Sequence, residues 1–370
     1  MLTRLDESLL HQAPLPFSSS VTSDHRFYDR CWVGAYDPAG GAALNFGLGV
    51  YKNMNTLDGF LCCVRGSAQR NVRVSRPLGD RMDDLGAGPL RYEVIEPYQH
   101  LRVRLDPTGG LACELDWRAR VEPFVESPTV SVINGRVATN VQRYDQVGSV
   151  DGWIAFGDDR IDLDNWFGAR DHSWGVRGGV GGFEPVNGPS PYDGGFFISW
   201  FVFLTERCAG YVQHNRDREG AVTFSDGVVR SRRGASDRRI VSVEQVVDFP
   251  AGSRCYSSAT MRLLDDAGEE HAVECRRLTQ PIVMRGAGYD GGYLDGRGLG
   301  VYRGDLVEYD EYDLAIEGRP SVAGTPDPVP GVQREQPVSV VFDGEPGVGD
   351  LTILAVGELP FLGRPIGTQR

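Results

Sequence analysis

The sequence predicts an all-β protein built from antiparallel strands, and two observations support that prediction. Short segments of alternating apolar and polar residues recur along the chain, with turn signals between them. The 370 residues also include 48 glycines and 22 prolines, which suit a chain with many turns and few helices. Meandering hairpins of this kind close into barrels or sandwiches. Short helices are expected only at residues 2–11 and 309–316.

Each hairpin is predicted from a turn signal between two strand-like segments. Asn134-Gly135, which follows segment 129–133, is a strong signal for a two-residue turn. The apolar stretch 196–204 has the length of a buried strand, and 239–249 is a long alternating segment. The other predicted pairs are 101–105 with 111–121, 152–156 with 161–167, 222–224 with 228–230, and 257–264 with 270–278, and the last strands are 338–342 and 351–356 after a proline-rich loop at 319–332.

The meanders recur weakly in two halves of the chain, which predicts two similar antiparallel barrels in tandem. With 41% hydrophobic residues, the chain can supply a core for both. We place the boundary near 143–148, so that the domains are residues 1–145 and 146–370. Exposed strand edges make a homodimer plausible.

Composition excludes several function classes. A formal net charge of -13 argues against sequence-independent binding to nucleic acid or to an anionic membrane. No apolar stretch reaches the roughly 18–20 residues that span a bilayer, and residues 1–17 lack the apolar region of a signal peptide. The seven cysteines include no Cys-x-x-Cys pair and are expected to be reduced. These features predict a cytoplasmic protein.

Cofactor and metal motifs are not expected either. The glycines at 178–182 lack the order of a phosphate-binding loop, and the histidines lack metal-site spacing. The acidic stretch at 308–313 lacks the calcium-loop pattern and is interpreted as a solvated face. We therefore predict no cofactor and no metal ligand.

The most informative segment is Arg-Asp-His-Ser-Trp-Gly at 170–175. In a strand, successive side chains point to opposite faces, so His172 and Trp174 share one face and Asp171 lies on the other. An imidazole exchanges protons near neutral pH, and an indole face stabilises a cation. A histidine beside a tryptophan on the inner wall of a barrel would suit chemistry on an apolar, electron-rich ligand.

This segment resembles the signature of the AttH-like group, which includes the carotenoid 1,2-hydratases (hydroxyneurosporene synthases). Trp-Val-Gly-Ala-Tyr-Asp-Pro at 32–38 is similar to the group's first strand, and Arg-Tyr-Asp-Gln-Val-Gly at 143–148 to the opening of its second half. The resemblance implies two lipocalin-like barrels in tandem and an apolar ligand, such as a polyene, a prenyl chain or a polycyclic lipid. It also implies that His172 and Trp174 line the pocket.

The hydratases use a Tyr-x-Asp on the following strand to protonate a double bond, and the matching segment 195–203 contains no acid here. The resemblance therefore leaves open a different reaction, or an acid in a loop, for which Asp193 and Glu184 are candidates. Adding water to an alkene requires a carboxyl acid, an aromatic shelter for the cation and a base.

Together these features predict a cofactor-independent lyase or isomerase that hydrates, cyclises or rearranges a hydrophobic unsaturated substrate, such as a terpenoid or steroid-like lipid. His172, Asp171 and Asp193 are the predicted catalytic residues. The predicted substrate-binding residues are Trp174, Trp200, Trp166, Phe197, Phe201, Arg170 and Arg177.

Two other interpretations stay open at the level of sequence. Two barrels could carry an apolar molecule without reacting with it. Alternatively, Arg170, Asp171 and Trp174 could lock the barrels together, with Asp171 in a structural ion pair and both rings serving as core. A large apolar cavity reached by His172 would favour the first two interpretations over the third.

Overall fold

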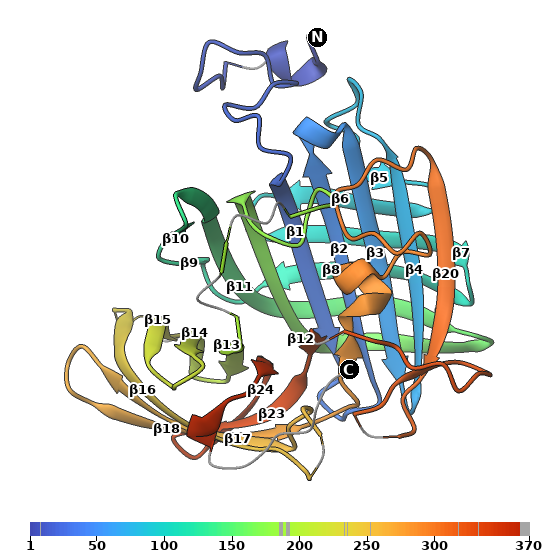
Figure 1. Cartoon of the computed structure of the whole chain (residues 1–370). Coiled ribbons are helices and arrows are strands. Elements are labelled where there is room, and N and C mark those ends of the chain that lie inside the picture. Colours follow the sequence, from blue (N-terminus) through green and yellow to red (C-terminus); the bar gives the residue numbers. More distant parts are fainter. Residues whose placement is uncertain are drawn as a thin grey trace.

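The computed structural model describes residues 1–362 except 8, 185–187, 190–192, 233, 235, 252, 317 and 332. Its strands form one sheet of fourteen strands and one closed barrel of eight (Figure 1). The all-β prediction is confirmed. The short helices are all 3-10: η1 Arg4–Glu7, η2 Lys52–Met54, η3 Met284–Ala287, η4 Tyr289–Gly291 and η5 Pro360–Leu362.

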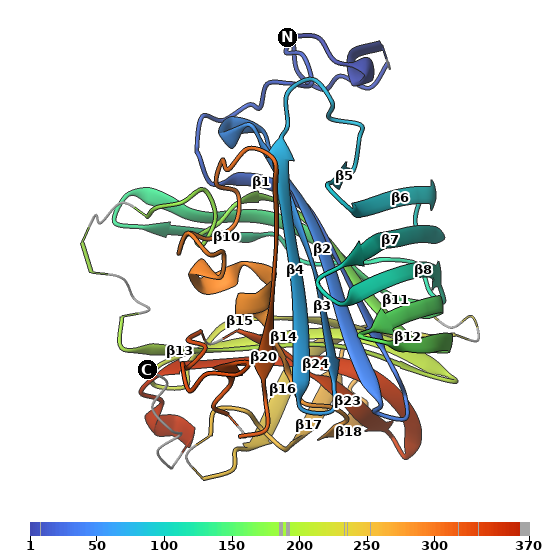
Figure 2. The ribbon, with the colours of Figure 1, turned by 90° about the vertical axis from the view of Figure 1, so that its right-hand side faces the viewer.

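The large sheet has the order β21-β20-β4-β3-β2-β1-β12-β11-β8-β7-β6-β5, and β9 and β10 also pair with β11. Figure 2 shows β6, β7 and β8 running across the direction of β2, β3 and β4, so the sheet folds over itself. Its strands are β1 Phe27–Tyr36, β2 Ala42–Tyr51, β3 Thr56–Arg65, β4 Ala68–Pro77, β5 Gly86–Ala87, β6 Leu90–Glu96, β7 His100–Thr108, β8 Leu111–Ala119, β9 Phe124–Val125, β10 Thr129–Ile133, β11 Arg136–Phe156, β12 Asp159–Val176, β20 Leu306–Asp313 and β21 Ser321–Val322.

The barrel closes in the order β13-β14-β15-β16-β17-β18-β23-β24. Aromatic side chains fill its interior, where Phe203 stacks on both Phe201 and Phe342. The strands are β13 Gly195–Thr205, β14 Cys208–Asp217, β15 Val222–Ser231, β16 Arg238–Asp248, β17 Ser258–Asp265, β18 Glu270–Arg277, β23 Pro337–Phe342 and β24 Glu345–Gly357, and a separate pair is formed by β19 Ile282–Val283 and β22 Arg334–Glu335.

The two predicted barrels correspond to the large folded sheet and to the closed barrel. Among the described residues only the second half closes, since the path of the first sheet ends at β5 and β21. The division expected at residue 145 falls inside β11, which pairs with β8 and β12 on either side. The motif at 170–175 consequently lies in the first sheet. After β18 the chain returns to this sheet through β20, which pairs with β4.

Several local predictions are confirmed and three are wrong. Asn134 and Gly135 turn the chain between β10 and β11 with φ of 50° and 81°. Most of the predicted helix at 309–316 belongs instead to the strand β20, because its backbone pairs with β4 and adds a strand to the sheet there. Segment 222–230 is one strand, β15, rather than a hairpin. The acidic face at 308–313 is not fully solvated, because buried Arg73 binds Glu308 at 2.7 Å and Asp310 at 3.0 Å.

No helix in the described part of the chain is long and apolar enough to cross a membrane.

Candidate functional site

Strand β12 separates two cavities, because its alternate side chains point to opposite faces. Arg170 and His172 line a cavity inside the folded sheet. Asp171 and Ser173 line a second one, between the sheet and the barrel. The alternation predicted for the motif is confirmed. We call these the sheet cavity and the junction cavity.

The sheet cavity has a volume of about 500 Å³ and a largely apolar wall. That volume lies in the range of pockets for small organic molecules. Its polar side chains include a group on β1, β11 and β12, namely Asp29, Tyr144, Arg170 and His172. The full lining is Leu5, Phe17, Asp29, Cys31, Leu48, Val50, Lys52, Met82, Leu85, Tyr92, Val94, Pro97, Tyr98, Leu101, Tyr144, Arg170 and His172.

Four of these polar side chains form one chain of hydrogen bonds. The Arg170 guanidinium donates to the Tyr144 hydroxyl at 2.7 Å. That hydroxyl lies 3.1 Å from His172 Nδ1, and His172 Nε2 lies 2.7 Å from Asp29 Oδ1. Strand pairing places them together, since Tyr144 lies opposite His172, and Asp29 opposite Trp174.

The donors along this chain can be assigned. Burial raises the pKa of Tyr144 to about 12, although the charge of Arg170 acts in the other direction. The phenol is therefore protonated at neutral pH, and beside a neutral imidazole it donates to Nδ1, which leaves Nε2 to donate to the Asp29 carboxylate. A carboxylate that orients a histidine, which in turn accepts from a hydroxyl, is the arrangement that activates hydroxyl groups in enzymes.

Arg170 is fixed by more than its hydrogen bond. Only 4% of the residue is exposed, and its guanidinium lies between the rings of Trp117 and Tyr144, 5.2 and 5.1 Å from their centroids. His172 is more open, with 37% of its side chain exposed. The polar chain thus runs from the interior at Arg170 to the solvent edge at His172 and Asp29.

Trp174 shares the face of His172, and their ring centroids lie 5.4 Å apart in an edge-on contact. It is 39% exposed and does not belong to the wall of either cavity. Its ring also meets the edge of Tyr144 at 6.5 Å. Trp174 therefore covers the outer side of the Tyr144–His172 pair.

The remaining predicted binding residues are divided between core and junction. Trp166 is buried in the core of the sheet, while Phe197 and Phe201 are buried in the core of the barrel. Trp200 and Arg177 line the junction cavity. The structure thus brings together His172, Arg170 and Trp174, and places the other predicted residues elsewhere.

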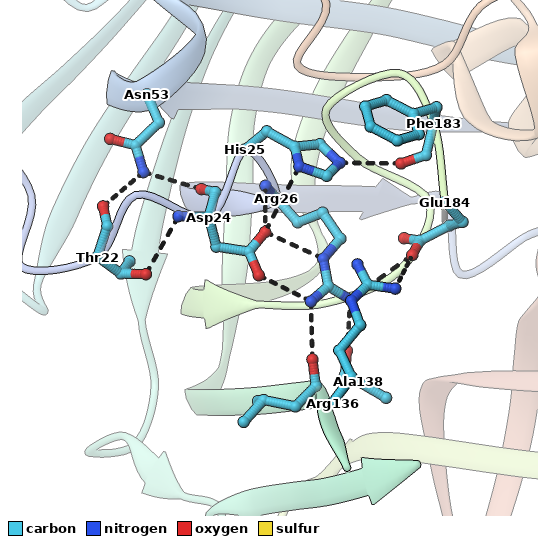
Figure 3. A network of polar contacts seen from close by, with 10 residues as sticks. Thr22, Asp24, His25, Arg26, Asn53, Arg136, Ala138, Phe183 and Glu184 are labelled. Atoms are coloured by element: carbon cyan, nitrogen blue, oxygen red, sulfur yellow. Dashed lines mark hydrogen bonds and ion pairs between the residues drawn. The ribbon is translucent and has the colours of Figure 1, made fainter. Parts of the chain in front are cut away.

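The two reserve acids lie outside both cavity walls. Asp193 is exposed in the turn that precedes β13. Figure 3 shows Glu184 in a polar network, where its carboxylate meets Arg136 at 3.1 Å and Arg26 at 3.6 Å. Asp24 engages the same Arg26 at 2.7 Å. The ion pairs of Glu184 connect the segment after β12 to β11 and to the chain that leads into β1.

Sequence reasoning missed Tyr144 and Asp29. Tyr144 stands in the segment 143–148 that carries the family resemblance, but nothing local marks it as a partner of a residue 28 positions later. Asp29 is separated from His172 by 143 positions. Only the pairing of β1 and β11 with β12 brings them together.

The junction cavity is smaller, about 230 Å³, and more polar. On the sheet side of this cavity, Asp171 of β12 forms an ion pair with Arg143 of the neighbouring β11 at 3.5 Å. The lining comes from the sheet, the barrel and the segments between them: Arg30, Trp32, Arg143, Asp171, Ser173, Arg177, Ile198, Trp200, Gln213, Tyr289, Gln333, Glu335, Thr352 and Leu354.

One group of metal-ligand types occurs in the described residues, at the β17–β18 turn. Asp265, Glu269 and His271 bring ligand atoms within 4.8 Å of one another. The Asp265 carboxylate already accepts the backbone N–H groups of Ala267 and Glu269. This group belongs to neither cavity wall.

The protein is similar in fold to several solved structures. A protein assigned as AttH from Nitrosomonas europaea superposes with a TM-score of 0.56 at 12% identity, over 94% of this chain and 99% of that one. Kievitone hydratase from Nectria haematococca gives 0.47 at 9% identity, over 89% and 88%. CghA bound to Sch210972 gives 0.48 at 10% identity, over 96% and 98%.

The first of these similarities confirms an AttH-like fold and shows nothing about activity. No curated protein sequence matches this chain. A family model does match, over residues 2–317, which is most of the chain. The protein therefore belongs to a family of unknown function (DUF8625).

Proposed function

We propose that the protein is a lyase or isomerase that moves protons on an apolar, unsaturated small molecule bound in the sheet cavity. One observation supports this most directly: His172 joins the Tyr144 hydroxyl to the Asp29 carboxylate at the wall of a large apolar cavity. The AttH-like resemblance and the apolar wall favour a terpenoid or steroid-like substrate. The reaction would use these side chains without a cofactor.

The polar chain would work as an acid–base pair. Tyr144 passes its proton to His172 Nδ1, and the Asp29 carboxylate stabilises the imidazolium while Arg170 stabilises the phenolate. The phenolate then removes a proton from a substrate carbon. In an isomerisation the same pair returns a proton to another carbon. In an elimination of water, the imidazolium gives its proton to the leaving hydroxyl, and hydration is the reverse.

Replacing His172 by alanine distinguishes an enzyme from a protein that only carries its ligand. His172→Ala should lower turnover of an unsaturated terpenoid by about 100- to 10,000-fold, because a positioned acid–base group contributes that much. Affinity for a non-reacting lipid in the sheet cavity should change little. The measurement pairs product analysis by mass spectrometry with ligand titration, after lipids that co-purify with the protein have been identified.

His271→Ala is the matched control, because His271 also contacts a carboxylate, Asp343, at 2.8 Å but lies in the barrel. It should keep full turnover. A protein that binds terpenoids but shows equal, negligible turnover in wild type and His172→Ala would be a carrier, and the enzymatic proposal would be wrong.

A further inference from the structure

The junction cavity presents hydrogen-bond donors that have no partner in the described part of the chain. Arg30 is 4% exposed, and neither its Nε nor its Nη1 has a hydrogen-bond partner among the described residues. The same holds for Arg177 Nε and for the indole N–H groups of Trp32 and Trp200. All four side chains line this cavity. Buried donors without acceptors are costly, so their gathering at one void points to a ligand rich in acceptors.

The three arginines that line the cavity differ in their ion-pair partners. Arg143 is neutralised by Glu126 at 3.3 Å and Asp171 at 3.5 Å. Arg30 and Arg177 form no ion pair within the described chain; their guanidiniums pack over aromatic rings, with Tyr289 at 4.9 and 5.8 Å respectively. Two buried cations that form no ion pair favour an anion.

The nearby carboxyl groups supply only part of that charge. Asp58 and Asp171 stabilise the Arg30 cation without forming an ion pair with it, and Asp171 is already paired with Arg143. Glu335 is buried and accepts the Thr352 hydroxyl, and burial raises its pKa to about 8, so at neutral pH this group is mostly uncharged. Positive charge therefore remains in excess at the cavity, most of all at Arg177, for which no carboxylate of the described residues acts on the pKa.

We propose that the junction cavity binds a small organic carboxylate, held by Arg30 and Arg177 and by the indole N–H groups of Trp32 and Trp200. Guanidinium groups match the two oxygens of a carboxylate. Ile198, Leu354 and the aromatic rings would enclose an apolar body. Among the described lining residues, the buried acceptor without a partner is Gln213 Oε1, which would take a hydroxyl or N–H elsewhere on the ligand. This site lies on the face of β12 opposite His172 and does not depend on the function proposed above.

Calorimetric titration of the full-length protein in chloride buffer tests the proposal. Benzoate or phenylacetate should bind saturably at a single site, and benzamide, which has nearly the shape of benzoate but no charge, should bind at least tenfold more weakly. Inorganic phosphate serves as the tetrahedral anion. If neither carboxylate binds, if benzamide matches benzoate, or if phosphate alone binds, the proposal is wrong.

Single-residue variants show whether benzoate binds in the junction cavity. Arg30→Gln and Arg177→Gln should each raise the dissociation constant for benzoate at least tenfold. Arg160→Gln, at an exposed arginine outside the cavity, should not change it. The ligand-free melting temperature of both cavity variants should hold or rise, because an unpaired buried cation is removed. A large fall would mean that these arginines serve folding, and would contradict the proposal.

Two further variants test the proposal even if an arginine variant fails to fold, and they distinguish binding in the junction cavity from binding in the sheet cavity. Trp200→Phe keeps an aromatic ring beside Trp32, which Trp200 meets edge-on at 5.9 Å, and removes the indole N–H, so it should weaken benzoate binding severalfold. His172→Ala should leave benzoate binding unchanged. Loss of benzoate binding in His172→Ala would show that the ligand sits in the sheet cavity instead.

Discussion

At the scale of single residues, the hydroxyl of Tyr144 connects the guanidinium of Arg170 to the imidazole of His172. Tyr144→Phe should keep the packing of the ring and lower kcat by about 100-fold or more, with KM nearly unchanged. Because the partially buried hydrogen bonds are lost, the free energy of unfolding should fall by about 1–3 kcal/mol. Steady-state kinetics and urea unfolding measure both effects.

Tyr309→Phe is the control for this variant, since Tyr309 is 61% exposed on β20. It should leave both quantities unchanged. If Tyr144→Phe alters KM alone, the hydroxyl binds substrate and takes no part in proton transfer.

A buried pair of carboxyl groups makes stability depend on pH. Burial raises the pKa of Asp350 to about 6 and that of Glu335 to about 8, and the charge of Asp350 adds to the effect on Glu335. The native state then holds more protons than the unfolded state between about pH 4 and pH 8. The free energy of unfolding should therefore fall as pH rises through this window.

Glu335→Gln tests this dependence, because the amide cannot ionise. The variant should flatten the loss of stability between pH 6 and pH 8 and be more stable than wild type at pH 8, as measured by urea unfolding. Glu358→Gln, at a carboxylate with 84% exposure, should follow the wild-type curve. An unchanged slope in Glu335→Gln would place the titrating group elsewhere.

The residue scale also shows what sequence can and cannot predict about the site. His172 and Arg170 were found because their motif is contiguous and strand alternation fixes which residues share a face. Tyr144 and Asp29 come from other strands, and no local pattern encodes the register that brings them to His172. Trp166, Phe197 and Phe201 have the composition of a pocket wall, but close packing makes them core.

At the scale of elements, two glycines allow β11 and β12 to pass Trp117. Gly148 and Gly168 lie opposite each other, and a Cβ at Gly168 would come within 2.6 Å of Trp117 Nε1. Gly168→Ala should lower the free energy of unfolding by about 1–3 kcal/mol through overpacking. Gly178→Ala, with its nearest contact at 3.5 Å, should change it by less than about 0.5 kcal/mol.

Urea unfolding of both glycine variants provides the comparison. Equal stability of the two would mean that the indole of Trp117 moves aside without cost, and that the close approach at Gly168 does not fix the path of β12.

Hairpins with strong turn signals were predictable because their strands are neighbours in sequence. β10 and β11 around Asn134-Gly135, and β17 and β18, follow that rule. β20 was mistaken for a helix because its partner, β4, lies more than 200 residues earlier. Its pattern Glu-Tyr-Asp-Glu-Tyr alternates only weakly, and its register depends on Arg73 binding Glu308 and Asp310.

At the scale of the whole molecule, the sheet and the barrel share a core. Trp32, Tyr36 and Phe60 of the sheet belong to the same buried cluster as Trp200 and Tyr211 of the barrel. The Tyr36 hydroxyl also donates to Asp350 of β24. The first sheet is incomplete without β20, which follows six of the barrel strands in sequence. Each half also has a buried cluster of its own, and this third cluster joins the two.

This organisation predicts a single cooperative unfolding transition. Far-UV circular dichroism, tryptophan fluorescence and hydrogen exchange in β3 and in β14 should give one common free energy of unfolding. A fragment ending at residue 183 should not fold, because it leaves the edge of β4 unpaired, Arg73 without its two carboxylates and the shared core exposed. Separate transitions for sheet and barrel, or a folded fragment, would show that the two cores are independent. In that case the junction cavity would be a contact between separately folding domains, and the arginines that line it would become buried only when the two halves associate.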